Sequence, residues 1–206
     1  HDMGIRQVSP VDFLKKQFDA PVFTQLYAQD YVRHRDRLRI FNKEHFYAHG
    51  EEYVSVFAPY AAAADIFINA IYYDPKAPAF FTPEEMSQTD FRIRVIADIT
   101  CDIAPESSVP STLRACTIAD PVFGYDPVKR AECAPFSADA IDVMAIDNLP
   151  SELPRDASDY FGRQLAEHVI PEFFKAHSAR LERACITEDG KLTPRYSYLS
   201  DYVYAF

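Results

Sequence analysis

The chain has 206 residues, of which 48% are hydrophobic and 14% aromatic, and this composition suffices for a packed core and excludes a disordered chain. Its formal net charge is −10, whereas nucleic-acid binding depends on clustered Lys and Arg, so the sequence predicts no nucleic-acid partner. No apolar run approaches the ~20 residues that span a bilayer, and residues 1–4 lack the features of a signal peptide, so we expect a cytoplasmic protein with no membrane partner.

The first predicted elements are a strand and a helix close to the amino terminus. Residues 6–8 have the character of a short strand. Ser9 is a typical N-cap residue and Pro10 suits the first helical position, so a helix is predicted to start there and to run through Lys16. The basic residues 33–39 are interpreted as a solvated helix face rather than as a functional patch.

Further helix signals follow before the centre of the chain. Residues 42–49 indicate a short helix that Gly50 closes, and residues 51–63 indicate a second helix. Thr82 and Glu85 have the spacing of a capping box, with proline at the first helical position. A short helix is therefore predicted after Thr82.

Three apolar runs in the middle of the chain each end abruptly in polar residues. These runs are residues 66–72, 95–102 and 143–150. Strands that are hydrophobic on both faces are typical of buried parallel sheets, and open parallel sheets bind ligands at the carboxyl ends of their strands. The runs therefore predict a parallel sheet with a ligand site at that edge.

The segment between the second and third runs is expected to be a loop. Residues 101–138 are rich in proline and short polar residues, which indicates an extended excursion over the strand ends. Loops in that place commonly carry binding groups.

The pattern changes to helix after Pro150. Ala157, Phe161, Leu165 and Val169 recur every four residues and form one apolar stripe, and the helical style continues to residue 185. A proline at position 171 should kink or restart the helix.

The chain ends in an aromatic segment. Residues 196–206 hold more aromatic surface than a free tail would leave in water, so the tail is expected to pack against another part of the protein. The aromatic side chains are Tyr196, Tyr198, Tyr202, Tyr204 and Phe206.

Few residues carry an obvious chemical signal. The five glycines form no G-x-G-x-x-G or P-loop pattern, so no phosphate-binding loop is encoded here. Asp98, Asp102 and Asp147 follow strands, where they could accept hydrogen bonds from ribose hydroxyls or hold a substrate amine, or could cap local turns; the spacing leaves both alternatives open. Cys101 lacks a nearby histidine motif, which favours a small buried thiol over a nucleophile.

The histidines do not predict a metal site. His45 and His49 lie four residues apart on a predicted helix, but Phe46 replaces the glutamate of the H-E-x-x-H zinc motif. Ordinary surface histidines are favoured, and no metal is expected. The cysteines lack C-x-x-C spacing, so free thiols are expected, and the sequence leaves a disulfide as the alternative.

Three segments carry a family resemblance. Residues 64–72 (ADIFINAIY), residues 97–102 (ADITCD) and residues 146–158, with the pattern L-P-x-E-L-P-R-x-A-S, resemble the carboxyl-terminal half of lysine-forming saccharopine dehydrogenases. Lysine-ketoglutarate reductases and, more distantly, the NAD-binding domains of alanine dehydrogenase and transhydrogenase are similar in architecture. The likeness covers nearly the whole chain.

The resemblance implies an α/β fold that is part of a larger enzyme. Residues 1–150 would form the C-terminal part of an NAD(P)-binding Rossmann-like domain, with a parallel sheet lacking its first strand and glycine loop. Residues 151–206 would form a helical tail that returns to an absent N-terminal domain. We therefore expect a C-terminal fragment that is inactive alone and that associates into a homo-oligomer through its exposed strand edge.

The resemblance also implies which residues contact ligands. NAD or NADP is the implied cofactor, without a metal, and the family's acid-base residues lie outside this chain, so no catalytic residue is assigned. The implied cofactor contacts are Tyr72, Ile99, Ile146, Asp147, Asn148 and Leu149, and the implied substrate contacts are Thr100, Cys101 and Asp102.

The function implied by the resemblance is amino-acid oxidoreduction. The leading hypothesis is hydride transfer between the nicotinamide and a small-molecule secondary amine of the saccharopine type. An oxidative deaminase similar to alanine dehydrogenase and a non-catalytic nucleotide-binding module are the alternatives.

Overall fold

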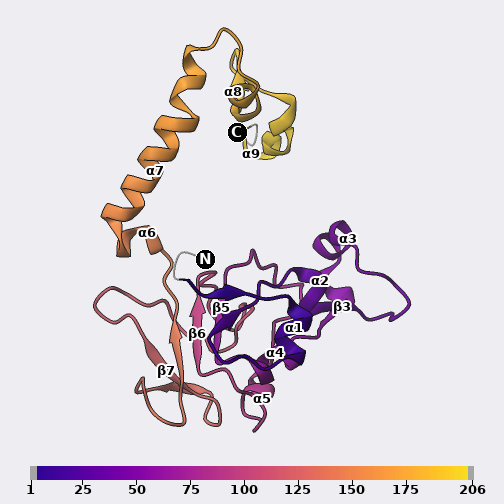
Figure 1. Cartoon of the computed structure of the whole chain (residues 1–206). Coiled ribbons are helices and arrows are strands. Elements are labelled where there is room, and N and C mark those ends of the chain that lie inside the picture. The colour runs from indigo at the N-terminus through magenta and orange to yellow at the C-terminus, as the bar shows by residue number, and fades with distance from the viewer. Residues whose placement is uncertain (1–3, 204–206) are drawn as a thin grey trace. The chain divides into compact units, whose positions relative to one another are not determined.

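The computed structural model describes residues 4–203 and divides into two compact units, His1–Leu149 and Pro150–Phe206 (Figure 1). The first unit is built around a five-stranded sheet in the order β5-β6-β9-β7-β8. The second unit is mainly helical. Among the described residues, no helix is long and apolar enough to cross a bilayer.

Three strands of the sheet run parallel, as the apolar runs predict. They are β5 (Ile66–Asn69), β6 (Val95–Asp98) and β9 (Ile141–Met144), with β6 in the middle. Their carboxyl ends meet at one edge, where Asn69 pairs in register with Asp98. The predicted α/β fold with a partial Rossmann-like sheet is thereby confirmed.

Two further strands, which the sequence did not predict, extend the sheet beyond β9. β7 (Phe123–Asp126) pairs antiparallel with β9 and with β8 (Ala131–Cys133), so the expected loop of residues 101–138 contains a hairpin. Asp126 shapes its turn, because its side chain accepts hydrogen bonds from the backbone N–H groups of Val128 and Lys129 at 3.0 and 2.9 Å. Strands this short, flanked by proline, give almost no periodic signal.

The two faces of the parallel strands differ in burial. Phe67, Ile96 and Val143 lie on the covered face, and Ile96 and Val143 are completely buried. On the other face Ile66 and Ile68 expose 61% and 62% of their surface. The expectation of burial on both faces is thus wrong for β5 among the described residues, and β5 is also an edge strand. Homo-oligomer formation through this edge stays a prediction.

An aromatic cluster fills the covered side of the sheet. The ring of Phe57 lies 5.0 Å from Phe67 and 5.1 Å from Phe80, and Phe81 lies 5.9 Å from Phe57. Helix α4 (Ala58–Ala63) adds Tyr60 and Ala61 to the same core. Edge-to-face and tilted pairs of this kind favour one arrangement of the rings, which fixes the position of the sheet against α4.

The amino-terminal elements follow the prediction closely. β1 (Arg6–Gln7) pairs in parallel with β2 (Val22–Phe23), and α1 spans Pro10–Lys15. Ser9 caps α1, since its hydroxyl accepts a hydrogen bond from the N–H of Asp12 at 3.1 Å. The capping box after Thr82 is also confirmed, and it begins α5 (Pro83–Met86).

Residues 28–57 depart most from the prediction. α2 (Ala28–Tyr31) leads into β3 (Val32–His34), which pairs antiparallel with β4 (Tyr53–Ser55); the predicted α3 (Lys43–Ala48) and a 3₁₀ turn, η1 (Gly50–Glu52), lie between them. The continuous helix expected over residues 51–63 and the helix face expected over residues 33–39 are therefore wrong. Pairing between these two segments outweighs their weak local helix preference.

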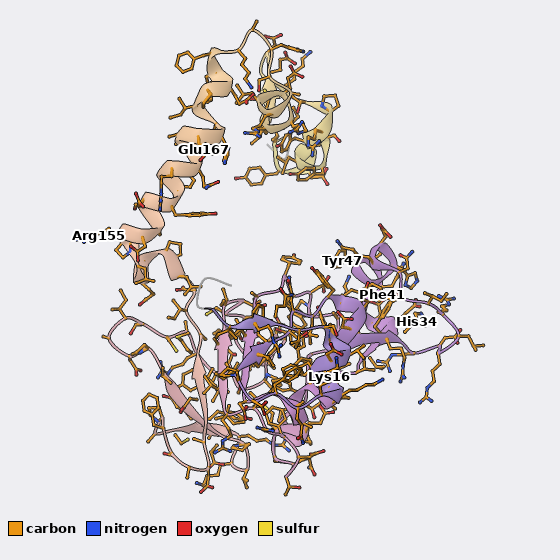
Figure 2. The ribbon with its side chains drawn as sticks, in the orientation of Figure 1. Lys16, His34, Phe41, Tyr47, Arg155 and Glu167 are labelled. Carbon is orange, nitrogen blue, oxygen red and sulfur yellow. The ribbon has the colours of Figure 1, made fainter. Side chains whose placement is uncertain are left out.

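The second unit contains the predicted long helix. α7 spans Pro154–His168, and the proline at position 171 restarts the chain as η2 (Ile170–Phe174), as predicted. Arg155 and Glu167 project from α7 (Figure 2). The remaining elements are α6 (Leu149–Glu152), α8 (Ala179–Ala184), β10 (Thr187–Glu188), β11 (Lys191–Leu192), η3 (Pro194–Leu199) and α9 (Ser200–Val203).

The expected packing of the aromatic tail is only partly found. Tyr196 is half-buried, and its hydroxyl donates a hydrogen bond to the carbonyl of Arg183 at 3.1 Å. Tyr198 and Tyr202 are 72% and 82% exposed, so the expectation is wrong for them. Tyr204 and Phe206 lie outside the described residues.

Candidate functional site

The candidate site is the carboxyl edge of the three parallel strands. Tyr72 follows β5, Ile99 to Asp102 follow β6, and residues 146–149 follow β9. Parallel pairing brings these three connections to the same edge of the sheet. All the residues expected to contact cofactor or substrate therefore lie in segments that leave one edge.

A buried polar network lies at the last residues of β5 and β6, at this edge of the sheet. Asp98 is 1% exposed, and its Oδ1 accepts a hydrogen bond from Nδ2 of Asn69 at 2.8 Å. Its Oδ2 accepts one from the hydroxyl of Thr112 at 2.6 Å, and the N–H of Cys101 lies 3.3 Å from Oδ1. Asn69 also donates to the hydroxyl of Ser108 at 2.9 Å. Both oxygens of Asp98 thus bind groups of this chain, which supports its local capping alternative over ligand binding.

Thr100 connects the first two strand ends. Its hydroxyl donates to the carbonyl of Ile71 at 3.0 Å and accepts from the N–H of the same residue at 3.2 Å. This reciprocal pair continues the β5–β6 contact beyond the strands and engages the hydroxyl in both roles. Thr100 consequently acts here as a link between the two connections, and a substrate contact by its side chain stays a prediction.

The third strand end is held by a cysteine. The N–H of Cys116 donates to the carbonyl of Ala145 at 2.6 Å, and the N–H of Ala145 lies 3.3 Å from the sulfur of Cys116. Ile146, which follows, is only 8% exposed. Little of Ile146 is therefore open to a cofactor, whereas Asp147 and Asn148 are exposed.

The outer residues of the edge offer different surfaces. Tyr72 is 93% exposed and presents a free aromatic face, while Ile99 and Leu149 are 40% and 37% exposed. An aromatic ring and apolar side chains next to carboxylates are typical of sites that hold a flat ring with polar substituents. The residues needed to cradle a pyrophosphate are not among them.

The electrostatics of the edge are acidic around Cys101. Burial, together with the negative charges of Asp147 and Asp98, raises the pKa of the Cys101 thiol to about 11. Burial also raises the pKa of the Asp102 carboxyl, with a further contribution from Asp98. The negative charges of Asp147 and Asp102 both contribute to the raised pKa of Cys101, so both carboxylates lie near this thiol at the same end of the sheet. A cationic amine would be favoured there.

The raised pKa makes Cys101 a slow nucleophile. At about pH 8, Cys101 is expected to react with iodoacetamide at least ~10-fold more slowly than the exposed Cys185, because the thiolate is the reacting form. Peptide mass spectrometry of briefly alkylated protein measures both rates. The difference should shrink as the pH approaches 11; labelling of Cys101 as fast as Cys185 at pH 8 would contradict the assigned environment.

Sequence reasoning missed the polar partners of Asp98. Asn69 lies inside an apolar run, and Ser108 and Thr112 lie in a segment expected to be a loop. Asn69 could have been found, because a polar residue within an apolar strand usually has a hydrogen-bond partner. Nothing local distinguishes Ser108 and Thr112, since only the fold brings Ser108 to Asn69 and Thr112 to Asp98.

The chain is similar in sequence to two groups of named proteins, although no family model matches it. It is 31% identical to alpha-aminoadipic semialdehyde synthase of Arabidopsis thaliana over 84% of this chain and 17% of that protein. It is 34% identical to saccharopine dehydrogenase [NAD(+), L-lysine-forming] of Candida glabrata over 61% of this chain and 36% of that protein. The chain is thus related in sequence to the lysine-forming saccharopine dehydrogenases and the alpha-aminoadipic semialdehyde synthases. The Neurospora crassa enzyme of the same name is 35% identical over 52% of this chain.

The family match covers part of each relative. The chain spans 17% of the length of the Arabidopsis protein and 36% of that of the Candida protein.

Proposed function

We propose that this chain contributes part of the cofactor and substrate site of an NAD(P)-dependent oxidoreductase that acts on a CH–NH bond of a saccharopine-type secondary amine. Two observations support the proposal: the relatives named saccharopine dehydrogenase, and the placement of all nine expected contact residues at one edge of the parallel sheet. The edge is the usual ligand position of open α/β sheets.

The residues divide into two groups by their chemistry. Tyr72, Ile99 and residues 146–149 would contact the cofactor through an aromatic face, apolar side chains and the polar ends of Asp147 and Asn148. Asp102 would hold the cationic amine of the substrate in the acidic surroundings of Cys101. When bound, a nicotinamide would accept or deliver the hydride, and the residues of this chain would bind and orient the substrate and exclude water.

The substrate is tested by comparing two reactions. The protein produced from the complete reading frame is assayed with lysine plus 2-oxoglutarate and NADH or NADPH, and separately with alanine and NAD or NADP. Turnover of the first pair supports the proposal, and turnover of alanine alone supports the deaminase alternative. Nucleotide binding without either turnover supports a non-catalytic module. This chain alone is expected to be inactive. Saccharopine turnover by it alone would contradict the proposal that it contributes only part of the site.

Asp102→Asn is expected to raise the KM for the amine substrate about 10–100-fold in that protein, because loss of one charge-assisted hydrogen bond costs roughly 1.5–3 kcal/mol. Initial rates over a range of substrate concentrations give the value. Asp139→Asn is the matched control, since Asp139 is exposed and lies just before β9, at the opposite end of that strand. Equal KM values for the two variants would show that Asp102 does not contact the substrate.

A further inference from the structure

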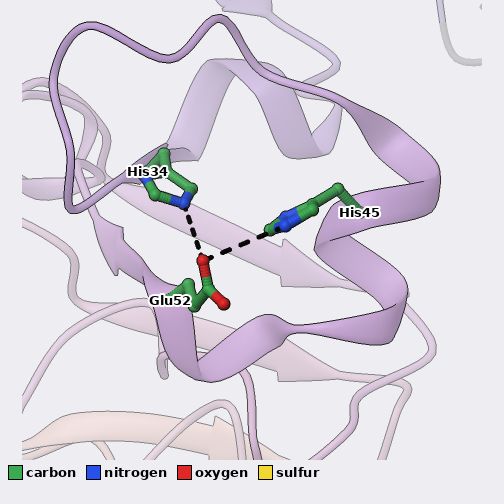
Figure 3. A group of neighbouring side chains, drawn as sticks. All are labelled: His34, His45 and Glu52. Carbon is green, nitrogen blue, oxygen red and sulfur yellow. Dashed lines mark hydrogen bonds and ion pairs between the residues drawn. The ribbon is translucent and has the colours of Figure 1, made fainter.

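Two histidines and a glutamate converge in the first unit, away from the strand ends described above. His34 is the last residue of β3, His45 lies on α3 and Glu52 ends η1. His34 Nε2 lies 3.0 Å and His45 Nε2 lies 3.9 Å from Oε2 of Glu52. The three possible ligand atoms all lie within 4.8 Å of one another. Figure 3 shows both imidazoles directed at one carboxylate oxygen.

The fold places these residues by strand pairing and helix capping. His34 pairs in register with Tyr53, the first residue of β4, so Glu52, which immediately precedes β4, lies next to His34. The N–H of Arg35 donates to the carbonyl of Glu52 at 2.8 Å and fixes this approach. Asn42 caps α3 by accepting from the N–H of His45 at 2.8 Å, which sets the position of that histidine.

The tautomer of His45 suits a metal ligand. The hydroxyl of Tyr53 donates to the carbonyl of Asn42 at 3.4 Å, so its oxygen is available to accept from Nδ1–H of His45 at 3.3 Å. With the proton on Nδ1, the lone pair of Nε2 points to Glu52. Histidine ligands usually donate their second N–H to such a partner.

His34 can adopt the same state by a shift of its proton. Its Nδ1 now accepts from the N–H of Asp36 at 2.9 Å and lies 3.3 Å from the carbonyl oxygen of Asp36. If Nε2 binds a cation, the proton moves to Nδ1, which then gives up the hydrogen bond from the N–H of Asp36 and has the carbonyl oxygen of Asp36 as its acceptor. His34 is 6% exposed, so its ring is held in place by the surrounding packing.

The cluster opens to solvent on one side. A cavity of about 520 Å³ lies beside it, lined by residues that include His34, Arg39, His45, His49 and Tyr53. Arg39 Nη1 lies 3.7 Å from Oε2 of Glu52, but its side chain is 57% exposed and can move into solvent when a cation enters. A cation would thus retain space for water or a small anion.

We propose that His34, His45 and Glu52 form a site for a divalent transition-metal ion of the Zn²⁺ class. Two imidazole nitrogens and one carboxylate oxygen are the ligand set of many zinc sites that keep an open position. The sequence expectation of no metal considered His45 with His49, whose Nδ1 lies 3.9 Å from Glu51. The structure instead pairs His45 with His34 and Glu52. The proposal is independent of the oxidoreductase activity.

Metal binding is tested with Zn²⁺ and Co²⁺ on this chain, purified without a polyhistidine tag. Calorimetric titration with Zn²⁺ is expected to give one ion per chain. Co²⁺ is expected to develop visible absorption bands typical of low coordination number, and Zn²⁺ should displace it. His45→Gln and Glu52→Gln are each expected to weaken Zn²⁺ binding at least ~10-fold, since loss of a ligand should exceed the 10–100-fold effect of removing a ligand's partner.

The matched control is another histidine with a carboxylate partner. His177 Nδ1 lies 2.9 Å from Oε1 of Glu182, its side chain is 86% exposed, and it lies in the second unit. His177→Gln should leave binding and the Co²⁺ spectrum unchanged. His34→Gln is a supporting variant only, because His34 is buried; circular dichroism shows whether each variant is folded. Absence of Zn²⁺ binding to the unaltered chain, or equal binding by folded His45→Gln and His177→Gln, would overturn the proposal and leave an ordinary ion-pair cluster.

Discussion

Replacing Asp98 with alanine is expected to lower the free energy of unfolding of the first unit by about 3–5 kcal/mol, because buried donors that lose their acceptor each cost roughly 1–3 kcal/mol. The donors are Nδ2 of Asn69, the hydroxyl of Thr112 and the N–H of Cys101. They come from β5, from the segment after β6 and from its first residues, and all three meet Asp98 at the carboxyl end of β6, the middle strand of the parallel set. The variant should therefore loosen the sheet and the candidate site together.

Amide hydrogen exchange of β6 and β9 peptides is a suitable measurement, because it reports on the first unit separately from the second. Asp65→Ala is the control: Asp65 Oδ1 accepts from Nε of Arg92 at 2.8 Å, but this pair is largely exposed and should contribute at most about 1 kcal/mol. Equal protection of β6 in the two variants would show that the Asp98 network does not stabilise the sheet.

The strands of the parallel sheet could be predicted because their signal is local. β5 and β6 lie within the apolar runs of residues 66–72 and 95–102, whereas β9 begins two residues before the run of residues 143–150 and overlaps only its start. The capping residues Ser9 and Thr82 were found for the same reason. In contrast, β3 and β4 are stabilised by each other, so neither segment has a decisive pattern of its own.

The position of the candidate site could be predicted from the sequence, but the role of each side chain in it could not. Asp98 and Asp147 look alike in the sequence, since each directly follows several apolar residues, but Asp98 is 1% exposed and both its oxygens accept hydrogen bonds, whereas Asp147 is exposed. Burial depends on which strand end other segments cover, and Asp98 is covered because Thr112 folds back from the segment that follows β6. The His34–Glu52 contact was missed for the same reason, because it depends on the β3–β4 pairing.

Gly124→Ala is expected to destabilise the first unit by about 3 kcal/mol or more, a large value for one added methyl group in a packed interior. A Cβ at this position would lie 2.4 Å from the carbonyl oxygen of Ala134 and 2.9 Å from the sulfur of Cys133. Gly124 is in β7, which is paired on both sides, with Cys133 on β8 and Asp142 on β9. Neither the backbone carbonyl nor the paired strand can move away without breaking the sheet.

Gly162→Ala provides the opposite case in the same chain. Gly162 lies inside α7, and a Cβ there would meet nothing within 4 Å. Alanine should therefore stabilise the helix by about 0.5–1 kcal/mol, because glycine loses more backbone freedom on folding. Thermal unfolding followed by circular dichroism, with hydrogen exchange to assign the unit, compares the two variants. If Gly124→Ala unfolds at the temperature of the unaltered chain, β7 cannot be packed against residues 133–134 in the manner described, and the antiparallel extension of the sheet would need a different register.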